Sequence, residues 1–267
     1  MQPPPMNDEQ LKFRDIDQTV PLETDIIKQR RWLRVIFSLV LVLCIAYGMI
    51  YLLLLRIERV TVVGCNYKDP LEVVEYSGLH YGMNMLFINK DAVEKAINED
   101  IYLVFQDLQR DYSARTVILT VYERVPVCTI QTLGMQCMLD VMGVVLELTE
   151  NIEPMNGMIV LTGLGVKDFR KGQTVSVENY SQYNAYLSVM YEIVYLNCAW
   201  MITEVSVLDP GNIYLELVNG MSVRLGDATL MRAKLIALLT VLDELANMGI
   251  TEGMVDVSSP VYPVYIP

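Results

Sequence analysis

Residues 35–55, VIFSLVLVLCIAYGMIYLLLL, decide the fold of this 267-residue chain. The stretch contains 21 consecutive residues without a charge. At about 1.5 Å per residue, a helix of that length spans the ~30 Å hydrocarbon core of a bilayer. A buried core helix this long would show a polar stripe, and none is present. No small-residue cleavage site follows, as a signal peptide would require. The sequence therefore predicts a single transmembrane helix.

Charged residues divide the chain at this helix. Six basic and six acidic residues precede residue 35, so the remaining 14 basic and 26 acidic residues, and the whole net charge of −12, follow it. Basic residues crowd the N-terminal flank, namely Lys28, Arg30, Arg31 and Arg34. This favours a cytoplasmic N-terminus and an extracytoplasmic C-terminal part. Residues 1–34 are expected to form a cytoplasmic head, largely disordered, since most of them are polar and aperiodic. The acidic external part argues against nucleic acid or anionic lipid as a partner.

Residues 56–124 have the pattern of a small α+β domain. The segment DPLE at residues 69–72 is a helix start, with Asp69 as cap and Pro70 at the first helical position, and Gly78 is placed to end that helix. The predicted elements, in order, are a strand at 57–64, a helix at 69–78, a helix from Asn89, and strands at 101–110 and 116–123. We expect a sheet covered on one face by two helices.

Residues 126–260 predict a mixed β domain with two helices. Short strands are expected at 127–131, 137–140, 144–148 and 158–162, with helices at 180–197 and 227–249. The segment IYLELVNGMSVRL at 213–225 predicts a hairpin. A three-residue loop with a glycine bulge at Gly220 pairs Leu215 with Val223 and places only apolar residues on the inner face.

The chain ends in MVDVSSPVYPVYIP. Residues 254–258 alternate as a strand, with Val255 and Val257 on one face, but the pattern does not say which face is buried. Two later prolines, Pro260 and Pro263, cannot donate to a ladder, so a strand here must be an edge strand or bulged. An edge strand leaves backbone groups unpaired and ready for another chain. Residues 261–267 are treated as a C-terminal tail.

No catalytic, cofactor-binding or metal-binding site is predicted. The sequence has no P-loop, G-x-G-x-x-G or H-E-x-x-H segment, and its single histidine, His80, lies in a loop. The external cysteines, Cys65, Cys128, Cys137 and Cys198, lack metal-ligand spacing and are expected to be buried free thiols, although Cys128 and Cys137 could approach across a hairpin. Two other functions stay open: a membrane-anchored ligand sensor, and a carboxylate-pair cell-wall hydrolase.

Several segments together resemble one family. They are IERVTVVGC, DPLEVVEYSGL, VYERVPVCTI, MLDVMGVVL, LTGLG, LVNGMSVRLG, KLIALLTVLDEL and VDVSSP, and they cover about residues 30–260 in the same order as the bacterial cell-division proteins FtsQ and DivIB. The resemblance implies that residues 56–124 are a POTRA domain and residues 126–260 the family's β domain. It also implies a non-enzymatic protein of the cell membrane, enriched at the division septum.

The same resemblance implies partners and a binding site. The expected partners are FtsB/DivIC-like and FtsL-like bitopic proteins and, indirectly, the septal peptidoglycan synthase. In this family an FtsB-type partner adds a strand to the last strand of the β domain. By position, that strand corresponds to Gly253, Met254, Val255, Asp256, Val257 and Ser258.

Overall fold

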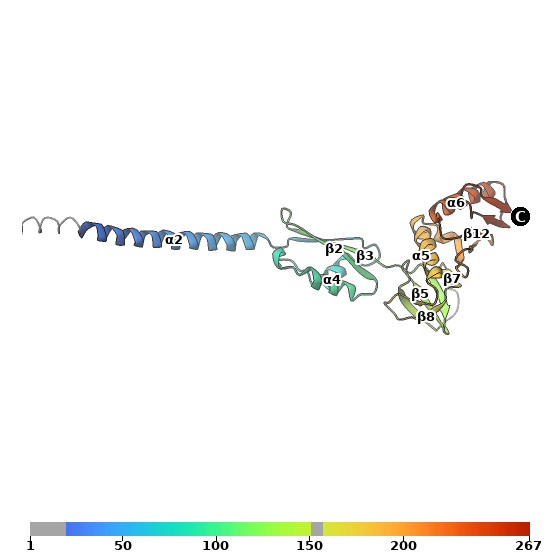
Figure 1. Ribbon diagram of the computed structural model, residues 1–267, viewed down its shortest axis with the longest axis horizontal. Coiled ribbons are helices and arrows are strands. Elements are labelled where there is room, and N and C mark those ends of the chain that lie inside the picture. Colours follow the sequence, from blue (N-terminus) through green and yellow to red (C-terminus); the bar gives the residue numbers. More distant parts are fainter. Residues whose placement is uncertain (1–19, 151–156) are drawn as a thin grey trace, which may run out of the picture. The chain divides into compact units, whose positions relative to one another are not determined.

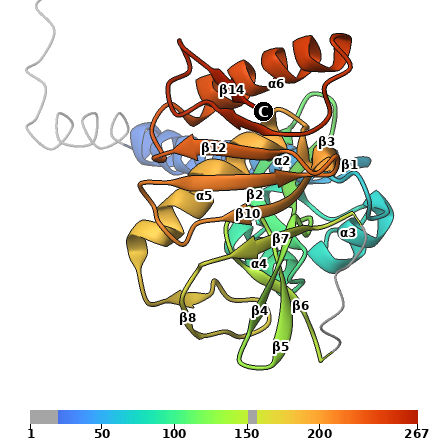
Figure 2. The same ribbon diagram turned by 90° about the vertical axis from the view of Figure 1, so that its right-hand side faces the viewer.

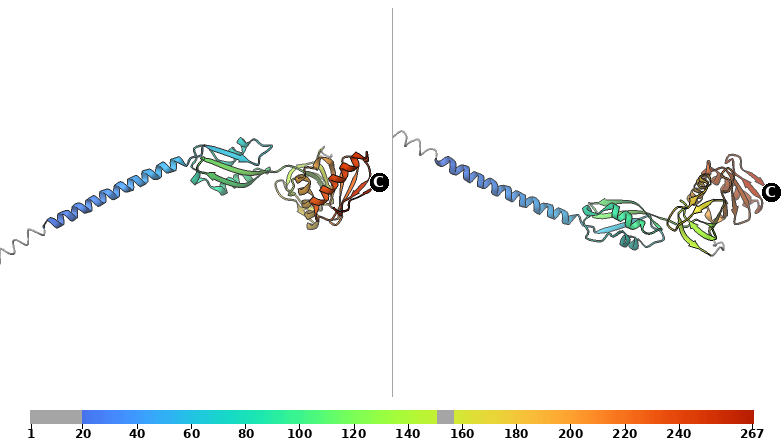
Figure 3. Two further views of the ribbon diagram at one scale, coloured as in Figure 1. Left: turned by 90° about the horizontal axis from the view of Figure 1, so that it is seen from above. Right: turned by 60° about the horizontal axis from the view of Figure 1, so that its bottom comes forward.

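The computed structural model describes residues 20–150 and 157–267. Its first element is α2 (Val20–Leu54), a single uninterrupted helix drawn in blue in Figures 1 and 3. The segment Arg30–Leu54 is long and apolar enough to cross a membrane, and its apolar window is not buried against the rest of the protein.

The helix begins well before the predicted start of the apolar run at residue 35. Residues 20–34 of the head that was expected to be largely disordered are therefore helical, while residues 1–19 lie outside the described part of the chain. The composition of this segment explains the extension, because Leu, Glu, Lys, Gln and Arg are good helix formers. Pro21 stands in the first turn, where its missing N–H leaves no helical bond unmade.

A three-stranded sheet with the order β1-β3-β2 follows the helix. Its elements are β1 (Arg59–Val63), α3 (Pro70–Ser77), the short 3₁₀ helix η1 (Met85–Phe87), α4 (Lys90–Asn98), β2 (Leu103–Asp111) and β3 (Thr116–Glu123). The Asn89 side chain caps α4 by accepting the N–H of Asp91 at 3.1 Å. Gly78, with φ of +70°, ends α3 as predicted. The predicted order of strands and helices is confirmed, and the assignment to the POTRA class stays a prediction.

A nine-stranded mixed sheet forms the C-terminal part, in the order β14-β13-β12-β11-β10-β7-β4-β5-β6 (Figure 2). Its strands are β4 (Cys128–Thr132), β5 (Met135–Leu139), β6 (Val145–Thr149), β7 (Ile159–Thr162), β10 (Ile202–Ser206), β11 (Ile213–Leu217), β12 (Ser222–Gly226), β13 (Met254–Asp256) and β14 (Val264–Ile266). A separate pair joins β8 (Val166–Asp168) to β9 (Ser176–Val177). The helices α5 (Tyr180–Tyr195) and α6 (Met231–Asn247) share one apolar core with the sheet. The α+β class and the two helices of this part are confirmed.

The hairpin of β11 and β12 has the predicted loop. Leu215 pairs with Val223, and the N–H of Leu217 donates to Met221 at 2.9 Å across the turn. Gly220 has a φ of +86°, the conformation that the predicted bulge requires. The pairing differs at one end, where Ile213 lies opposite Gly226 because the register shifts after it.

Two strands of the large sheet are missing from the sequence prediction. The central strand β10 is one of them, because a register shift between Ile202 and Glu204 interrupts the alternation that marks a strand. The other is β14, whose flanking prolines made the tail look irregular.

The chain divides into two compact units that do not follow the predicted domains. The first contains the described residues through Val63 together with Pro70–Val93 and Leu108–Leu119, and the second contains Gly64–Asp69, Glu94–Asp107 and Thr120–Pro267. The predicted boundary near residue 125 therefore stays a prediction.

Candidate partner-binding edge

The predicted edge strand is not an edge in the structure. β13 pairs in parallel with β12 on one side and antiparallel with β14 on the other. The expectation of an unpaired edge at residues 254–258 is therefore wrong, because the tail folds back after Pro260 and adds one more strand. β14 is the outermost strand of the sheet.

The direction of each backbone group along β13 follows from two hydrogen bonds to β12. Gly253 C=O accepts the N–H of Ser222 at 3.2 Å, and the N–H of Val257 donates to Arg224 at 2.9 Å. Because backbone groups alternate direction along a strand, those of Met254 and Asp256 face β14.

The outer side of β14 offers few donors. Val264 and Ile266 lie opposite Asp256 and Met254, so their backbone groups face β13, and those of residues 263, 265 and 267 face away from the sheet. Two of these three outward positions are prolines, which have no N–H. The edge is thus blunted in the way that natural sheets use to avoid unwanted pairing.

One face of the edge belongs to the core. Val255 and Val257 are fully buried, which settles the face that the alternation left open. Tyr265 lies opposite Val255, packs against the core and donates its hydroxyl to the carbonyl of Glu252 at 2.8 Å. Gly253 permits this contact, because a Cβ there would lie 2.8 Å from the Tyr265 ring. Tyr265 is therefore the side chain that holds β14 in place.

The opposite face of the edge is open to solvent and partly apolar. Val264 is 52% exposed and Ile266 45% exposed, on the same face as Met254 and Asp256. Arg224 of β12 pairs with Asp256 at 3.1 Å. Burial raises the pKa of Asp256, but hydrogen bonds from Ser258 and Arg224 outweigh it and hold the pKa below its usual value. The edge thus combines exposed aliphatic side chains with a fixed ion pair.

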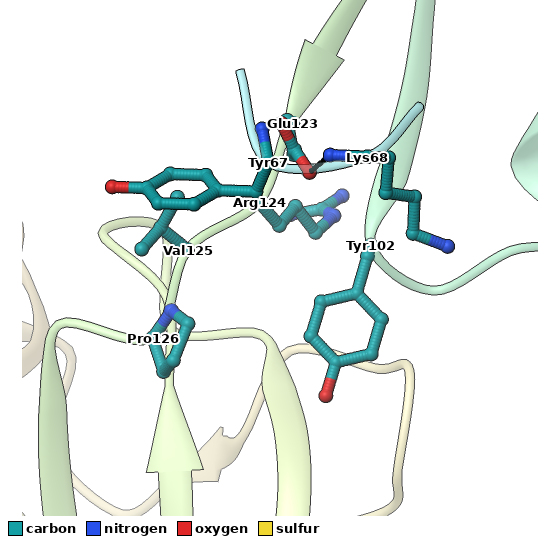
Figure 4. A pocket seen from close by; sticks show the side chains of 7 residues that line it. All are labelled: Tyr67, Lys68, Tyr102, Glu123, Arg124, Val125 and Pro126. Atoms are coloured by element: carbon teal, nitrogen blue, oxygen red, sulfur yellow. Dashed lines mark hydrogen bonds between the residues drawn. The ribbon is translucent and has the colours of Figure 1, made fainter. Parts of the chain in front are cut away.

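A pocket of about 480 Å³ is a second candidate site (Figure 4). Its lining residues are Tyr67, Lys68, Tyr102, Glu123, Arg124, Val125 and Pro126. The Glu123 carboxylate accepts the backbone N–H groups of Asn66, Tyr67 and Lys68 at 2.7, 2.8 and 3.0 Å. Arg124 forms an ion pair with Asp140. Because its charged groups are engaged with other protein groups, the pocket offers a ligand mainly an apolar hollow.

No family model and no curated protein matches this sequence. The assignment to the FtsQ/DivIB family thus remains a prediction from the resemblance of the sequence segments.

Side chains that could ligate a metal do not gather in the described residues. These residues contain no group of three or more His, Cys, Asp or Glu side chains that could hold a metal ion. His80 is exposed, with its ring nitrogen 3.4 Å from the carbonyl of Gly78. Among the described residues, hydrogen bonds lower the pKa of the Asp111, Asp227 and Asp256 carboxyl groups.

The five cysteines are all free thiols. Cys128, Cys137 and Cys198 are buried as predicted, whereas Cys65 is half-buried. Burial raises the pKa of Cys128 to about 12 and that of Cys137 to about 11. Cys137 lies opposite Ile130, two residues from Cys128 along β4, so the two are diagonal neighbours and not a cross-strand pair.

Sequence reasoning missed Val264, Tyr265 and Ile266. The alternation of exposed, half-buried and exposed residues over β14 is only three residues long, which is too short to stand out from a proline-rich tail. One sequence signal was available. Pro263 and Pro267 are four residues apart, so in a strand their missing N–H groups lie on the same side, which can be the unpaired outer side of an edge strand.

Proposed function

We propose that this chain is a membrane-anchored, non-enzymatic scaffold of the bacterial division machinery, of the FtsQ/DivIB type. In this proposal α2 crosses the membrane with the N-terminus in the cytoplasm, and the external part binds FtsB/DivIC-like and FtsL-like partners at the septum. Those partners link the scaffold to the septal peptidoglycan synthase. The support is the order of sequence segments together with a helix long enough to span the bilayer.

The observation that carries the binding role is the end of the nine-stranded sheet. The backbone groups of Met254 and Asp256 face a strand of only three residues, β14. That strand contributes few hydrogen bonds, each with a net value of about 0.5–1.5 kcal/mol. A longer partner strand makes more of them, so it can take the position that β14 holds and pair with β13.

In this mechanism residues 253–258 remain the binding strand that the sequence resemblance implies, but they can bind only after β14 has moved away. β14 has to detach before the partner pairs, because its blunted outer side offers few donors. The exposed residues Val264 and Ile266 would then leave the outer face, and side chains of the partner would cover Met254 in their place.

The test uses the full chain in nanodiscs and the external segment of an FtsB/DivIC-type protein, with binding measured by calorimetry. Met254→Pro removes an N–H that faces the partner without removing a bond to β12, so binding should weaken. Met254→Ala is the matched control, because it trims the side chain but keeps the N–H. Equal affinity of the two variants, with unchanged circular dichroism, would show that β13 is not the pairing strand.

A further inference from the structure

The loop of residues 81–87 is bonded directly to the end of α2. The Asn84 side chain donates to the carbonyl of Leu52 at 2.6 Å, and the N–H of Met85 donates to the carbonyl of Leu55 at 2.9 Å. Two further backbone hydrogen bonds join the loop to the residues after the helix: the N–H of Ile57 donates to the carbonyl of Met83, and the N–H of Gly82 donates to the carbonyl of Ile57, both at 2.9 Å. Figure 1 shows the chain coming back to the end of the helix at this point.

These bonds fix the loop at the end of the apolar segment. Helix ends leave their last four carbonyls without helical partners. The loop supplies a donor to one of them, that of Leu52, and another to the carbonyl of Leu55, the residue that follows the helix. Leu55, Ile57 and Met85 are buried at the junction, with exposed fractions of 7%, 2% and 0%. The loop and the last turn of α2 therefore form one packed element.

Three large apolar or aromatic side chains of this loop point into solvent. Tyr81 is 65% exposed, Leu86 47% and Phe87 72%. Leu86 and Phe87 belong to η1, whose first turn is fixed by the Asn84 side chain, which accepts the N–H of Leu86 at 2.9 Å. Exposed residues of this size on one loop indicate a contact surface.

The bilayer is the occupant that the position of the loop indicates. The apolar run ends at Leu55, so the loop lies where the hydrocarbon core meets the headgroups, a zone about 5–8 Å deep on each side. Aromatic side chains are enriched at this depth. Arg56 and Arg59, both exposed, follow the helix and can reach lipid phosphates.

We propose that Tyr81, Leu86 and Phe87 insert into the outer interface of the membrane beside the exit of α2. The inference rests on the membrane insertion of α2 in the proposed function. The helix alone leaves the first unit free to tilt about the exit point, whereas the loop adds a second contact with the bilayer. The two contacts together hold the three-stranded sheet at a set angle to the membrane surface.

The test places one tryptophan at a time in the full chain, reconstituted in lipids with or without brominated acyl chains. In a Trp32→Phe, Trp200→Phe background, Phe87→Trp reports on the loop and Ile45→Trp on the insertion of α2. Leu71→Trp is the matched control, because Leu71 is 69% exposed but stands at the far end of α3. The eight residues of α3 make a helix about 12 Å long.

We expect the emission of Phe87→Trp and Ile45→Trp to be quenched by brominated lipid and blue-shifted, and that of Leu71→Trp to be unaffected. If the emission of Ile45→Trp were quenched and that of Phe87→Trp were not, α2 would be inserted but the loop would not contact the bilayer. The exposed side chains of the loop would then have to contact a protein partner instead. If neither were quenched, the insertion of α2 and the inference would both fail. Leu86→Trp repeats the measurement one residue away, should the first substitution disturb the fold.

Discussion

Replacing Tyr265 with alanine should loosen β14 and strengthen partner binding. The substitution removes the hydroxyl that donates to Glu252 at 2.8 Å, a neutral hydrogen bond with a net value of about 0.5–1.5 kcal/mol. It also removes a half-buried ring from the core, which adds about 1 kcal/mol, since full burial of a large apolar side chain contributes about 1.5–3 kcal/mol. Together the two losses weaken the attachment of β14 by about 2 kcal/mol.

The effect on affinity follows from the fraction of molecules in which β14 is detached. If the partner binds only molecules in which β14 is detached, its apparent Kd is its intrinsic Kd divided by the fraction of those molecules. Because each 1.4 kcal/mol is tenfold, Tyr265→Ala should bind up to about 30-fold more tightly. Tyr265→Phe keeps the ring and loses only the hydrogen bond of about 1 kcal/mol, so its gain should be about fivefold.

Binding of the external segment of an FtsB/DivIC-type protein to the full chain in nanodiscs measures this series. Tyr262→Ala is the control, because Tyr262 lies in the same tail but is 77% exposed, and its removal should not change the affinity. Unchanged or weaker binding by Tyr265→Ala, with the protein folded by circular dichroism, would refute the displacement of β14.

Three further predictions concern stability and chemical reactivity. Glu123→Gln should lower the free energy of unfolding by about 2 kcal/mol, because it replaces the charged acceptor of three N–H bonds; a loss below about 0.5 kcal/mol in urea unfolding would contradict this. The hydrogen bond from Lys234 lowers the pKa of Asp227 to about 2. The stability that the ionised Asp227 carboxylate contributes is therefore present above pH 3.8, its ordinary pKa, and is lost as the pH falls toward 2. Asp227→Asn should thus make the stability measured by thermal unfolding less dependent on pH in this acidic range. Burial raises the pKa of Cys128 and Cys137 to about 12 and 11, so iodoacetamide at pH 8 should modify them only after unfolding, as mass spectrometry would show. Rapid labelling of either thiol in the folded protein would disprove their burial.

The sequence was informative where local chemistry is strong. The Asn219-Gly220 turn predicted the hairpin of β11 and β12, and Asp69-Pro70 predicted the start of α3 to within a residue. Both signals depend on a few neighbouring residues and need no knowledge of the rest of the chain.

The strand order at the end of the large sheet could not be predicted from such local signals. Whether residues 254–256 form an outer or an inner strand depends on where the last seven residues fold, and no local pattern fixes that. The contact of Tyr265 with Gly253 joins residues twelve apart through a positive φ of 110° at the glycine. Likewise, the Asn84 bond to Leu52 links positions that sequence reasoning treated as separate elements.

The scaffold function is tested most directly by the affinity of the full chain for the external segments of FtsB/DivIC-type and FtsL-type proteins, with and without residues 261–267. The intact chain should bind, and the deletion, which frees the backbone groups of Met254 and Asp256, should bind more tightly. Absence of binding in both forms would contradict the scaffold function. Binding that is lost with the deletion would show that the partner docks on β14 itself.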